Sequence, residues 1–388
     1  MKMQLCTIIE YQKSKEKGDS MGTQYTKKLI LEDKTEYYGF GFGADKDSVF
    51  ELVFNTCMAG YQEILSDPSY TDQGVVMTYP LIGNYGMADD DYETQVPTIG
   101  ALMVREYHDT PSNFRATQTL SAVMQKFQIP GISGIDTRKL TRSIRDFGSR
   151  KALLTNADTP LEEGLQRLQA FSMPTDAVSR VSCKQPWYIQ AKNAHCHIVA
   201  IDCGIKHHIL ESFQKRGCDV TVVPWNTSAQ EIERLCPDGV FLSNGPGNPE
   251  DVQPVIDTIC ALRGKYPMFG ICFGHQLLAL AYGARTYKMK FGHHGGNHPV
   301  RNLLTGKVEI TSQNHSYAVA PESLKGTGLE ATHINLLDES VEGMVCNKDK
   351  IFSVQYHPES APGPQDSGYL FDQFVTMLKE EKSHAKKN

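Results

Sequence analysis

One cysteine stands in a sequence context that is typical of reactive thiols. Residues 270–274 read Gly-Ile-Cys-Phe-Gly, after an apolar run and before a helix-like segment. Gly-x-Cys-x-Gly is the cysteine form of the nucleophile elbow, in which glycines let the chain turn sharply from a strand into a helix. The positive end of such a helix lowers the pKa of a cysteine. The spacing predicts a nucleophile at Cys272 or, as the alternative, a buried cysteine at a strand–helix corner.

A histidine and a glutamate follow another apolar run and supply the partners that such a nucleophile needs. His357 and Glu359 come directly after residues 351–356, Ile-Phe-Ser-Val-Gln-Tyr. In an extended segment a spacing of two places both side chains on one face. We therefore expect Glu359 to orient the imidazole of His357 and to stabilise its charged form, completing a triad with Cys272.

A tight turn lies at a third strand end. Residues 244–249 read Asn-Gly-Pro-Gly-Asn-Pro and follow the apolar run 239–242. A Gly-Pro-Gly turn exposes backbone N–H groups to an anion. Together with the N–H of Phe273 it would form an oxyanion hole for a tetrahedral intermediate. Taken alone, however, the motif is more typical of an ordinary structural turn.

The elements that must position these residues alternate regularly in the second half of the chain. Strand-like apolar runs lie at 197–201, 220–223, 239–242 and 267–270. Helix-like stretches lie between them, at 206–216, 229–235 and 255–263. This alternation predicts parallel βαβ units in a sheet covered by helices on both faces. In such sheets reactive groups gather at the carboxyl ends of the strands.

The first half of the chain has a different character. Short strand-like runs, such as 48–54 and 74–79, are separated by turn residues, and helices are expected at 118–127 and 137–147. We expect four segments along the chain. They are an unstructured extension at 1–20, a smaller N-terminal domain at 21–185, a polar linker at 186–194 and an α/β domain at 195–388.

The overall composition is that of an ordinary globular protein. Of 388 residues, 40% are hydrophobic and 22% charged, with a net charge of -6. This balance argues against nucleic-acid binding, which needs a basic face. No apolar run approaches the ~20 residues of a membrane helix. The 10 cysteines show no metal or disulfide spacing, which favours reduced thiols and a cytoplasmic location.

The three motifs, in this order, resemble those of class I glutamine amidotransferases. Strings outside the catalytic motifs resemble the small subunits of carbamoyl phosphate synthetases, at residues 53–70, 78–86, 134–141 and 288–300. Amidotransferases that serve anthranilate or GMP synthesis lack this N-terminal domain. The resemblance covers nearly the whole chain. It implies a class I amidotransferase-like α/β domain with a mostly parallel sheet covered by helices, preceded by a smaller mixed β/α domain.

The resemblance also implies a reaction. Cys272 would attack the side-chain amide of L-glutamine, releasing ammonia and leaving a glutamyl thioester that water hydrolyses. His357 would move the protons and Glu359 would orient it. The family's glutamine contacts correspond to Cys57, Gly245, Gly247, Phe273 (through its backbone), Gln276, Asn314, Ser316 and Tyr317. Positions 57, 316 and 317 depart from the family pattern, which has a serine, a glycine and a phenylalanine there.

The same resemblance implies a partner subunit. The chain has no Gly-x-x-x-x-Gly-Lys-Ser/Thr loop, and in this family a separate large subunit binds ATP, Mg²⁺ and bicarbonate and receives ammonia through an enclosed tunnel. We therefore expect no cofactor in this chain. The N-terminal domain and residues 291–300, whose glycines suggest a loop, are expected to help form the contact with the large subunit. No metal site is expected among the histidines of that segment, His293, His294 and His298.

Two alternatives remain open from the sequence. A glutaminase that feeds another synthase would keep the catalytic motifs but not the strings at 55–70 and 291–300. A scaffold or regulatory subunit with weak catalysis would keep the fold, and the departures at Cys57, Ser316 and Tyr317 leave room for it. The motifs fit arginine and pyrimidine synthesis equally.

Overall fold

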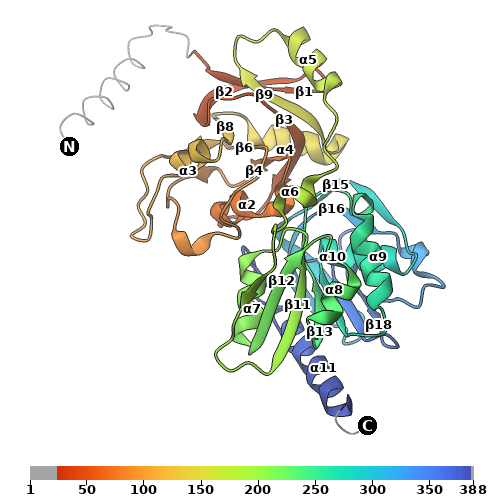
Figure 1. Ribbon diagram of the computed structural model, residues 1–388. Helices are drawn as coiled ribbons and strands as arrows, with labels where there is room; N and C mark the ends of the chain where they lie inside the picture. Colours follow the sequence, from red (N-terminus) through yellow and green to blue (C-terminus); the bar gives the residue numbers. More distant parts are fainter. Residues whose placement is uncertain (1–23, 386–388) are drawn as a thin grey trace.

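The computed structural model describes residues 24–385, whose strands form a barrel, a large sheet and a small strand pair (Figure 1). The barrel comes from the N-terminal half of the chain and the ten-stranded sheet from the C-terminal half. The small pair joins β5 (Leu81–Ile82) to β7 (Glu106–Tyr107). The expected extension at 1–20 lies outside the described residues.

The strands of the barrel pack apolar side chains on both of their faces. In order around the barrel the strands are β1 (Lys27–Leu31), β2 (Glu36–Gly43), β8 (Pro130–Ser133), β6 (Ala101–Met103), β4 (Gln73–Met77), β3 (Ser48–Asn55) and β9 (Arg150–Asn156). Leu29 and Leu31 of β1 pack in one cluster, whereas Ile30 between them packs with Leu168. Neighbouring residues pack on opposite faces because the side chains of a strand alternate with a period of two.

Short helices surround the barrel. They are α2 (Tyr61–Ser66), α3 (Leu120–Lys126), α4 (Thr137–Phe147) and α5 (Leu161–Ala170), whereas α6 (Ala177–Val181) packs its Val178 in a core of the large sheet. The bounds of α4 follow from its sequence. The Asp136 carboxylate accepts a hydrogen bond from Lys139 N at 2.9 Å, which caps the first turn, and Gly148 ends the helix with a φ of 96°.

The large sheet is parallel in one half and antiparallel in the other. Its strand order is β10 (Trp187–Ile189), β12 (Cys218–Pro224), β11 (Cys196–Asp202), β13 (Gly239–Leu242), β14 (Met268–Ile271), β19 (Ile351–Val354), β18 (Val341–Cys346), β17 (Glu330–Asn335), β15 (Thr286–Asn302) and β16 (Val308–Val319). Pairing from β12 to β19 is parallel, and every other pairing is antiparallel. The prediction of a mostly parallel sheet is therefore not confirmed, because β15 to β18 follow one another without α-helices between them.

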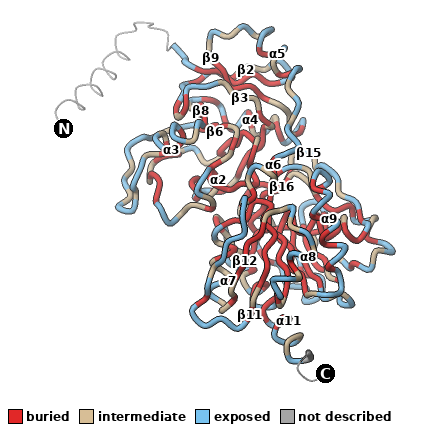
Figure 2. Tube along the Cα trace, viewed as in Figure 1, coloured by how far each residue is buried: buried red, intermediate tan, exposed pale blue. Residues whose placement is uncertain are grey.

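Helices cover both faces of the parallel half. Helices α7 (His207–Lys215) and α11 (Tyr369–Ala385) pack on one face, and α8 (Ala229–Arg234), α9 (Gln253–Leu262) and α10 (Phe273–Ala281) pack on the other. Successive residues of β11 alternate between these cores, with Ile198 in the first and Val199 in the second. Figure 2 shows the result, with buried residues along the strands and exposed residues on the outer helices and loops.

The barrel and the sheet meet along β15. Its residues 291–300 form part of a strand rather than the expected loop, and the pairing with β16 changes register between Lys288 and His293 and again between Gly295 and His298. From this strand, His294 O accepts a hydrogen bond from Thr56 N at 3.2 Å, and Lys290 O accepts one from Ser149 N at 2.8 Å. Within the segment expected as a linker, Trp187–Ile189 forms β10.

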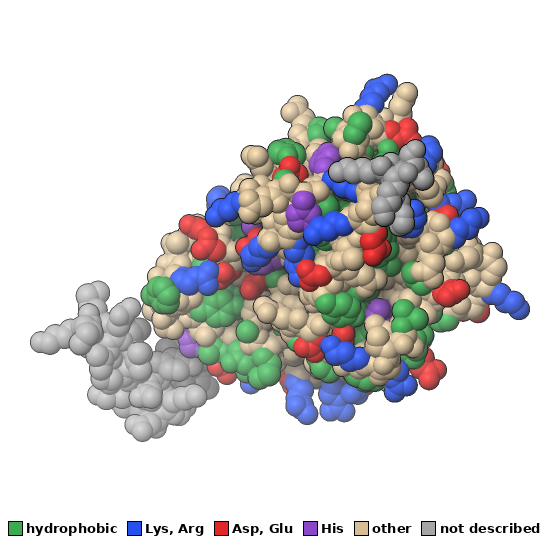
Figure 3. Space-filling view, turned by 90° about the horizontal axis from the view of Figure 1, so that it is seen from below, with side chains coloured by type: hydrophobic (Ala, Val, Ile, Leu, Met, Phe, Trp, Pro, Cys, Tyr) green, Lys and Arg blue, Asp and Glu red, His purple; other side chains and the backbone are tan. Residues whose placement is uncertain are grey.

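The surface mixes charges of both signs. On the face drawn in Figure 3, acidic and basic side chains are interspersed with apolar ones. Among residues 24–385, no helix combines the length and the apolar character that crossing a membrane requires.

Candidate active site

Cys272 occupies a strained turn between a strand and a helix. It follows β14 and immediately precedes α10, with φ 55° and ψ -103°. A Cβ atom on Gly274 would lie 2.2 Å from Leu242 O, and one on Gly270 would lie 2.8 Å from the backbone of Gly274. Both neighbours must therefore be glycine. Holding a non-glycine residue at such dihedral angles costs on the order of 1–3 kcal/mol and is characteristic of functional sites.

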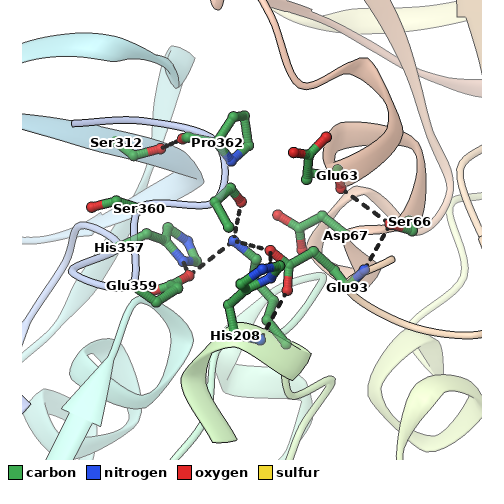
Figure 4. Close-up of polar contacts among 12 residues, drawn as sticks. Glu63, Ser66, Asp67, Glu93, His208, Ser312, His357, Glu359, Ser360 and Pro362 are labelled. Atoms are coloured by element: carbon green, nitrogen blue, oxygen red, sulfur yellow. Dashed lines mark hydrogen bonds and ion pairs between the residues drawn. The ribbon is translucent and has the colours of Figure 1, made fainter. Parts of the chain in front are cut away.

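His357 and Glu359 form the pair that their spacing predicts. They follow β19, and His357 Nδ1 lies 2.7 Å from Glu359 Oε1. The backbone is fixed by a hydrogen bond from His357 N to Ser312 O at 2.9 Å. Figure 4 shows the two side chains together, reaching a buried polar cluster from the same side.

The charge state of His357 depends on its neighbours. Burial lowers the pKa of its imidazole, but the Glu359 carboxylate and then Cys272 outweigh burial and raise it to about 10. Within residues 24–385 its Nε2 is buried and has no hydrogen-bond partner. This nitrogen is therefore available for proton exchange. The thiol of Cys272 donates a weak hydrogen bond to Asn314 O at 3.5 Å.

A cavity of about 250 Å³ opens in front of Cys272. It brings together most of the residues that the sequence predicts for glutamine binding, namely Gly245, Gly247, Phe273, Gln276, Asn314, Ser316 and Tyr317. Because an amino acid of the size of glutamine fits such a volume, the arrangement supports a small polar substrate rather than a large one.

Backbone N–H groups line one side of this cavity. Phe273 opens α10, and the first N–H groups of a helix have no acceptor within the helix. Gly247 has a φ of 85°, a left-handed conformation that favours glycine. A Cβ atom on Gly245 would lie 2.5 Å from Cys203 O, so this turn packs directly against the end of β11. The turn and the helix N-terminus together favour an anion beside Cys272.

Some of the polar side chains that line the cavity are already held by hydrogen bonds. Gln276 donates from Nε2 to Tyr317 O at 2.8 Å, which ties α10 to β16. Gln73, from the barrel strand β4, donates to Ser316 Oγ at 3.2 Å. The hydroxyl at position 316, where the family pattern has glycine, therefore has a partner from the barrel.

Cys57 does not lie in this cavity. It lines a separate space of about 210 Å³ with residues such as Tyr79 and Tyr85, and burial raises its thiol pKa to about 11. Its backbone N–H donates to Asn55 Oδ1 at 2.7 Å. Ser69 lines the active cavity instead and accepts a hydrogen bond from Asn244 Nδ2 at 3.0 Å. Ser69 belongs to the same string, 53–70, that suggested Cys57.

Lys206 is a second residue that the motifs did not reveal. Its Nζ lies 2.9 Å from Glu359 Oε1 and donates to Ala361 O at 2.6 Å. Burial disfavours the charged form of Glu359, but Lys206 and then His357 outweigh it and hold the carboxyl pKa below its usual range. Lys206 follows the carboxyl end of β11, and that position is the sequence signal that would have found it.

A group of possible metal ligands lies in the antiparallel half of the sheet, and its His315 also lines the cavity at Cys272. Ligand atoms of His293, His315 and Glu342 lie within 4.8 Å of one another. Both nitrogens of His315 face acceptors, Tyr317 O at 2.7 Å and Gln313 Oε1 at 3.0 Å. Of the three histidines considered from the sequence, only His293 belongs to this group. The polar contacts of His293 are hydrogen bonds and ion pairs with other residues of the protein.

Comparison with known families gives two matches that cover different parts of the chain. Residues 29–154 match the family described as Carbamoyl-phosphate synthase small chain, CPSase domain. Residues 199–377 match Glutamine amidotransferase class-I. The first range includes the barrel strands and the second includes Cys272, His357 and Glu359.

Close relatives match over nearly their full length. The chain is 52% identical over 359 residues to the "Carbamoyl phosphate synthase pyrimidine-specific small chain" of Halalkalibacterium halodurans, covering 92% of this chain and 99% of the relative. It is 50% identical to the "Carbamoyl phosphate synthase small chain" of Staphylococcus saprophyticus, covering 92% and 96%. It is 52% identical to that of Fusobacterium nucleatum, covering 91% and 98%. At this identity and coverage, the chain belongs to the carbamoyl phosphate synthase small-chain family, with a class I glutamine amidotransferase domain in its second half.

Proposed function

We propose that this protein is the glutamine-hydrolysing small chain of a carbamoyl phosphate synthase. The observation that carries the proposal is the buried pair of His357 and Glu359, 2.7 Å apart, beside a strained Cys272 that lines a small polar cavity. A cysteine, a histidine and an orienting carboxylate form the machinery of acyl transfer through a thioester. The high similarity to small chains supports this reaction over a purely structural role.

Catalysis begins with the thiol of Cys272. His357 takes its proton at Nε2, and the thiolate attacks the side-chain amide carbon of L-glutamine. The imidazolium that forms is stabilised by Glu359, which accepts the hydrogen bond from Nδ1. His357 then returns the proton to the leaving nitrogen, so that ammonia departs and a glutamyl thioester remains on Cys272. Water activated by His357 hydrolyses the thioester to glutamate.

The oxyanion of each tetrahedral intermediate needs donors in place before it forms. Phe273, at the start of α10, and the turn residues Gly245 and Gly247 line the same cavity as Cys272 and could supply such donors from their backbone N–H groups. Donors of this kind lower the barrier because they require no reorganisation during the reaction. The remaining wall, with Gln276, Asn314, Ser316, Tyr317 and Ser69, would hold the rest of the glutamine molecule.

Ammonia is useful to a synthase only when it is passed on. We propose that a large chain receives it through an enclosed path and combines it with bicarbonate at the expense of ATP, with Mg²⁺. This chain would then hold no cofactor of its own. The barrel and the β15 region would contribute to the contact with that large chain. The reaction would take place in the cytoplasm, where the 10 cysteines of the chain stay reduced.

The proposal is tested by measuring glutamate release from glutamine, with and without a cognate large chain, bicarbonate and ATP. We expect slow hydrolysis by the isolated chain, a marked rise with the large chain, and loss of hydrolysis in Cys272→Ser. The matched control is Cys260→Ser, because Cys260 is exposed on α9. Hydrolysis that survives Cys272→Ser would make the elbow a structural corner, and a chain that accelerates no large chain would remove the assignment to this synthase.

A further inference from the structure

Behind the triad lies a buried charge cluster that the steps above leave unused. Lys206 Nζ lies 2.9 Å from Glu359 Oε1 and 3.3 Å from Glu93 Oε1. The side chains of Lys206, Glu93 and Glu359 are 3%, 0% and 0% exposed. Burial disfavours the charge of an ammonium group, so Lys206 remains charged only because carboxylates surround it.

Glu93 enters this cluster from the barrel half of the chain. It follows the short 3-10 helix at Asp89–Asp91, and its N–H donates to Ser66 Oγ at 2.9 Å. Its carbonyl accepts a hydrogen bond from His207 N, at the start of α7, at 2.9 Å. Figure 4 shows Glu93 on the side of the cluster opposite His357 and Glu359. Glu93 is thus fixed to both halves of the protein.

We propose that Glu93 is a positioning residue for glutamine hydrolysis, which holds Lys206 from the barrel side and so determines how strongly Glu359 binds His357. This role rests on the proposed function, in which His357 serves Cys272. Glu93 is not among the residues that line the cavity at Cys272. Its effect on hydrolysis must therefore come through the buried charge cluster and not through contact with glutamine.

The coupling follows from one shared oxygen atom. Glu359 Oε1 lies 2.7 Å from His357 Nδ1 and 2.9 Å from Lys206 Nζ, so the two cationic groups compete for it. While Glu93 balances part of the charge on Lys206, Glu359 keeps its interaction with the imidazolium. If Glu93 is made neutral, Lys206 draws more on Glu359, and the cluster loses one negative charge. Both changes make the imidazolium form of His357 less stable.

Other titratable groups surround the cluster and must be separated from this effect. The groups that face Lys206 besides Glu93 and Glu359 are Asp67, Glu63, Cys57 and Tyr70. On the far side, His208 Nδ1 lies 3.1 Å from Glu93 Oε1, and Glu93 raises the pKa of that histidine. Because His208 shares Glu93 Oε1 with Lys206, it needs its own control.

The experiment measures kcat/KM for glutamine against pH, using this chain in complex with its large chain. The alkaline limb reports loss of the His357 imidazolium, and in Glu93→Gln we expect it to move to lower pH by about half a unit or more. Glu93→Asp keeps the charge and should restore most of the profile. Glu211→Gln removes an α7 carboxylate that pairs with Lys215 at 2.9 Å, and His208→Gln removes the other partner of Glu93. Both controls should leave the limb in place.

A double-mutant cycle separates positioning from a general effect on structure. With Lys206→Met in the background, Glu93→Gln should shift the limb less than it does in wild type, because Lys206 no longer competes for Glu359 and only the loss of one negative charge remains. The rate of Cys272 alkylation by iodoacetamide, measured against pH, compares the same variants in the absence of glutamine turnover. A Glu93→Gln profile that superimposes on wild type overturns the role, as does an equal shift with and without Lys206.

Two further outcomes distinguish a failure of the role of Glu93 from a failure of the proposed function. If Glu93→Gln does not fold, Glu93→Asp carries the test. Its shorter side chain should move the limb in the same direction by a smaller amount, and no movement contradicts the role. Hydrolysis that is independent of Cys272 rejects the proposed function itself, whereas Cys272-dependent hydrolysis with unmoved profiles rejects only the role of Glu93.

Discussion

Asp67 and Asn314, 247 positions apart in the chain, connect the barrel to the active cavity through one buried hydrogen bond. Asn314 Nδ2 donates to Asp67 Oδ2 at 2.8 Å. The other side-chain atom of Asn314, Oδ1, lies 3.0 Å from His294 Nδ1. The side chain of Asn314 is therefore fixed by residues on either side, and its carbonyl stays beside the thiol of Cys272. The cavity is built by both halves of the protein.

This connection predicts a defect for Asp67→Ala. The substitution leaves two buried donors, Asn314 Nδ2 and Ser69 N, without their acceptor. Such a loss costs about 1–3 kcal/mol. We expect KM for glutamine to rise about fivefold or more, with a smaller change in kcat. Asp89→Ala, on the exposed 3-10 helix, is the control and should change neither. Equal kinetics for both variants would show that the connection does not shape the cavity.

A glycine pair tests whether the turn at Gly247 acts on the site itself. Gly247 and Gly306 have φ angles of 85° and 72°, and an added Cβ meets no close atom at either position. Alanine should therefore destabilise both variants similarly, by about 1–2 kcal/mol in unfolding experiments. Only Gly247→Ala should lower kcat/KM, by about tenfold or more, because this residue lines the cavity. A Gly247→Ala protein with unchanged turnover would remove the turn from the oxyanion site.

Ser69 and Cys57 give opposite expectations. Ser69 lines the cavity at Cys272, and Ser69→Ala removes a hydroxyl group worth about 1 kcal/mol, or roughly fivefold in KM. Cys57 lines a different space, so Cys57→Ser should leave KM for glutamine within about twofold. Steady-state kinetics of the two variants in the complex decide between them. A large effect of Cys57→Ser alone would restore the assignment made from the family pattern.

The ion pairs of His293 predict a pH-dependent stability. Burial lowers the pKa of this histidine, but Asp338 and Glu342 outweigh burial and raise it from 6.5 to about 9. A raised pKa stabilises the folded state fully below pH 6.5, and this contribution is lost as the pH rises through about 9. It is on the order of 3 kcal/mol. Urea unfolding should therefore show a gap between wild type and His293→Gln that narrows over this range. A gap that does not depend on pH would contradict the ion pairing.

Local patterns predicted the elements that carry the chemistry. The expected helix at 137–147 coincides with α4, because a capping aspartate and a terminating glycine mark its ends. The expected strand at 239–242 coincides with β13, and the elbow at Cys272 joins a strand to a helix as its glycines predict. These features depend on neighbouring residues, which a sequence displays directly.

Long-range pairings were not predictable in the same way. Glycines at 292, 295 and 296 are typical of loops, yet they lie in β15, whose pairing with β16 resumes at His293–Gly295 and again at His298 after each shift of register. Barrel closure depends on β1 pairing with both β2 and β9, and no local pattern specifies the second partner. Lys206 and Glu93 meet only in the folded protein, for the same reason.

The most direct test of the central claim is to trap the acyl intermediate on Cys272. The complex is mixed with glutamine, quenched in acid within the turnover time and digested, and the peptides are weighed by mass spectrometry. We predict a glutamyl adduct on the peptide that contains Cys272, absent in Cys272→Ser and increased in amount when hydrolysis of the thioester is slowed. Turnover without any such adduct, or an adduct on another residue, would contradict the assignment of Cys272 as the nucleophile.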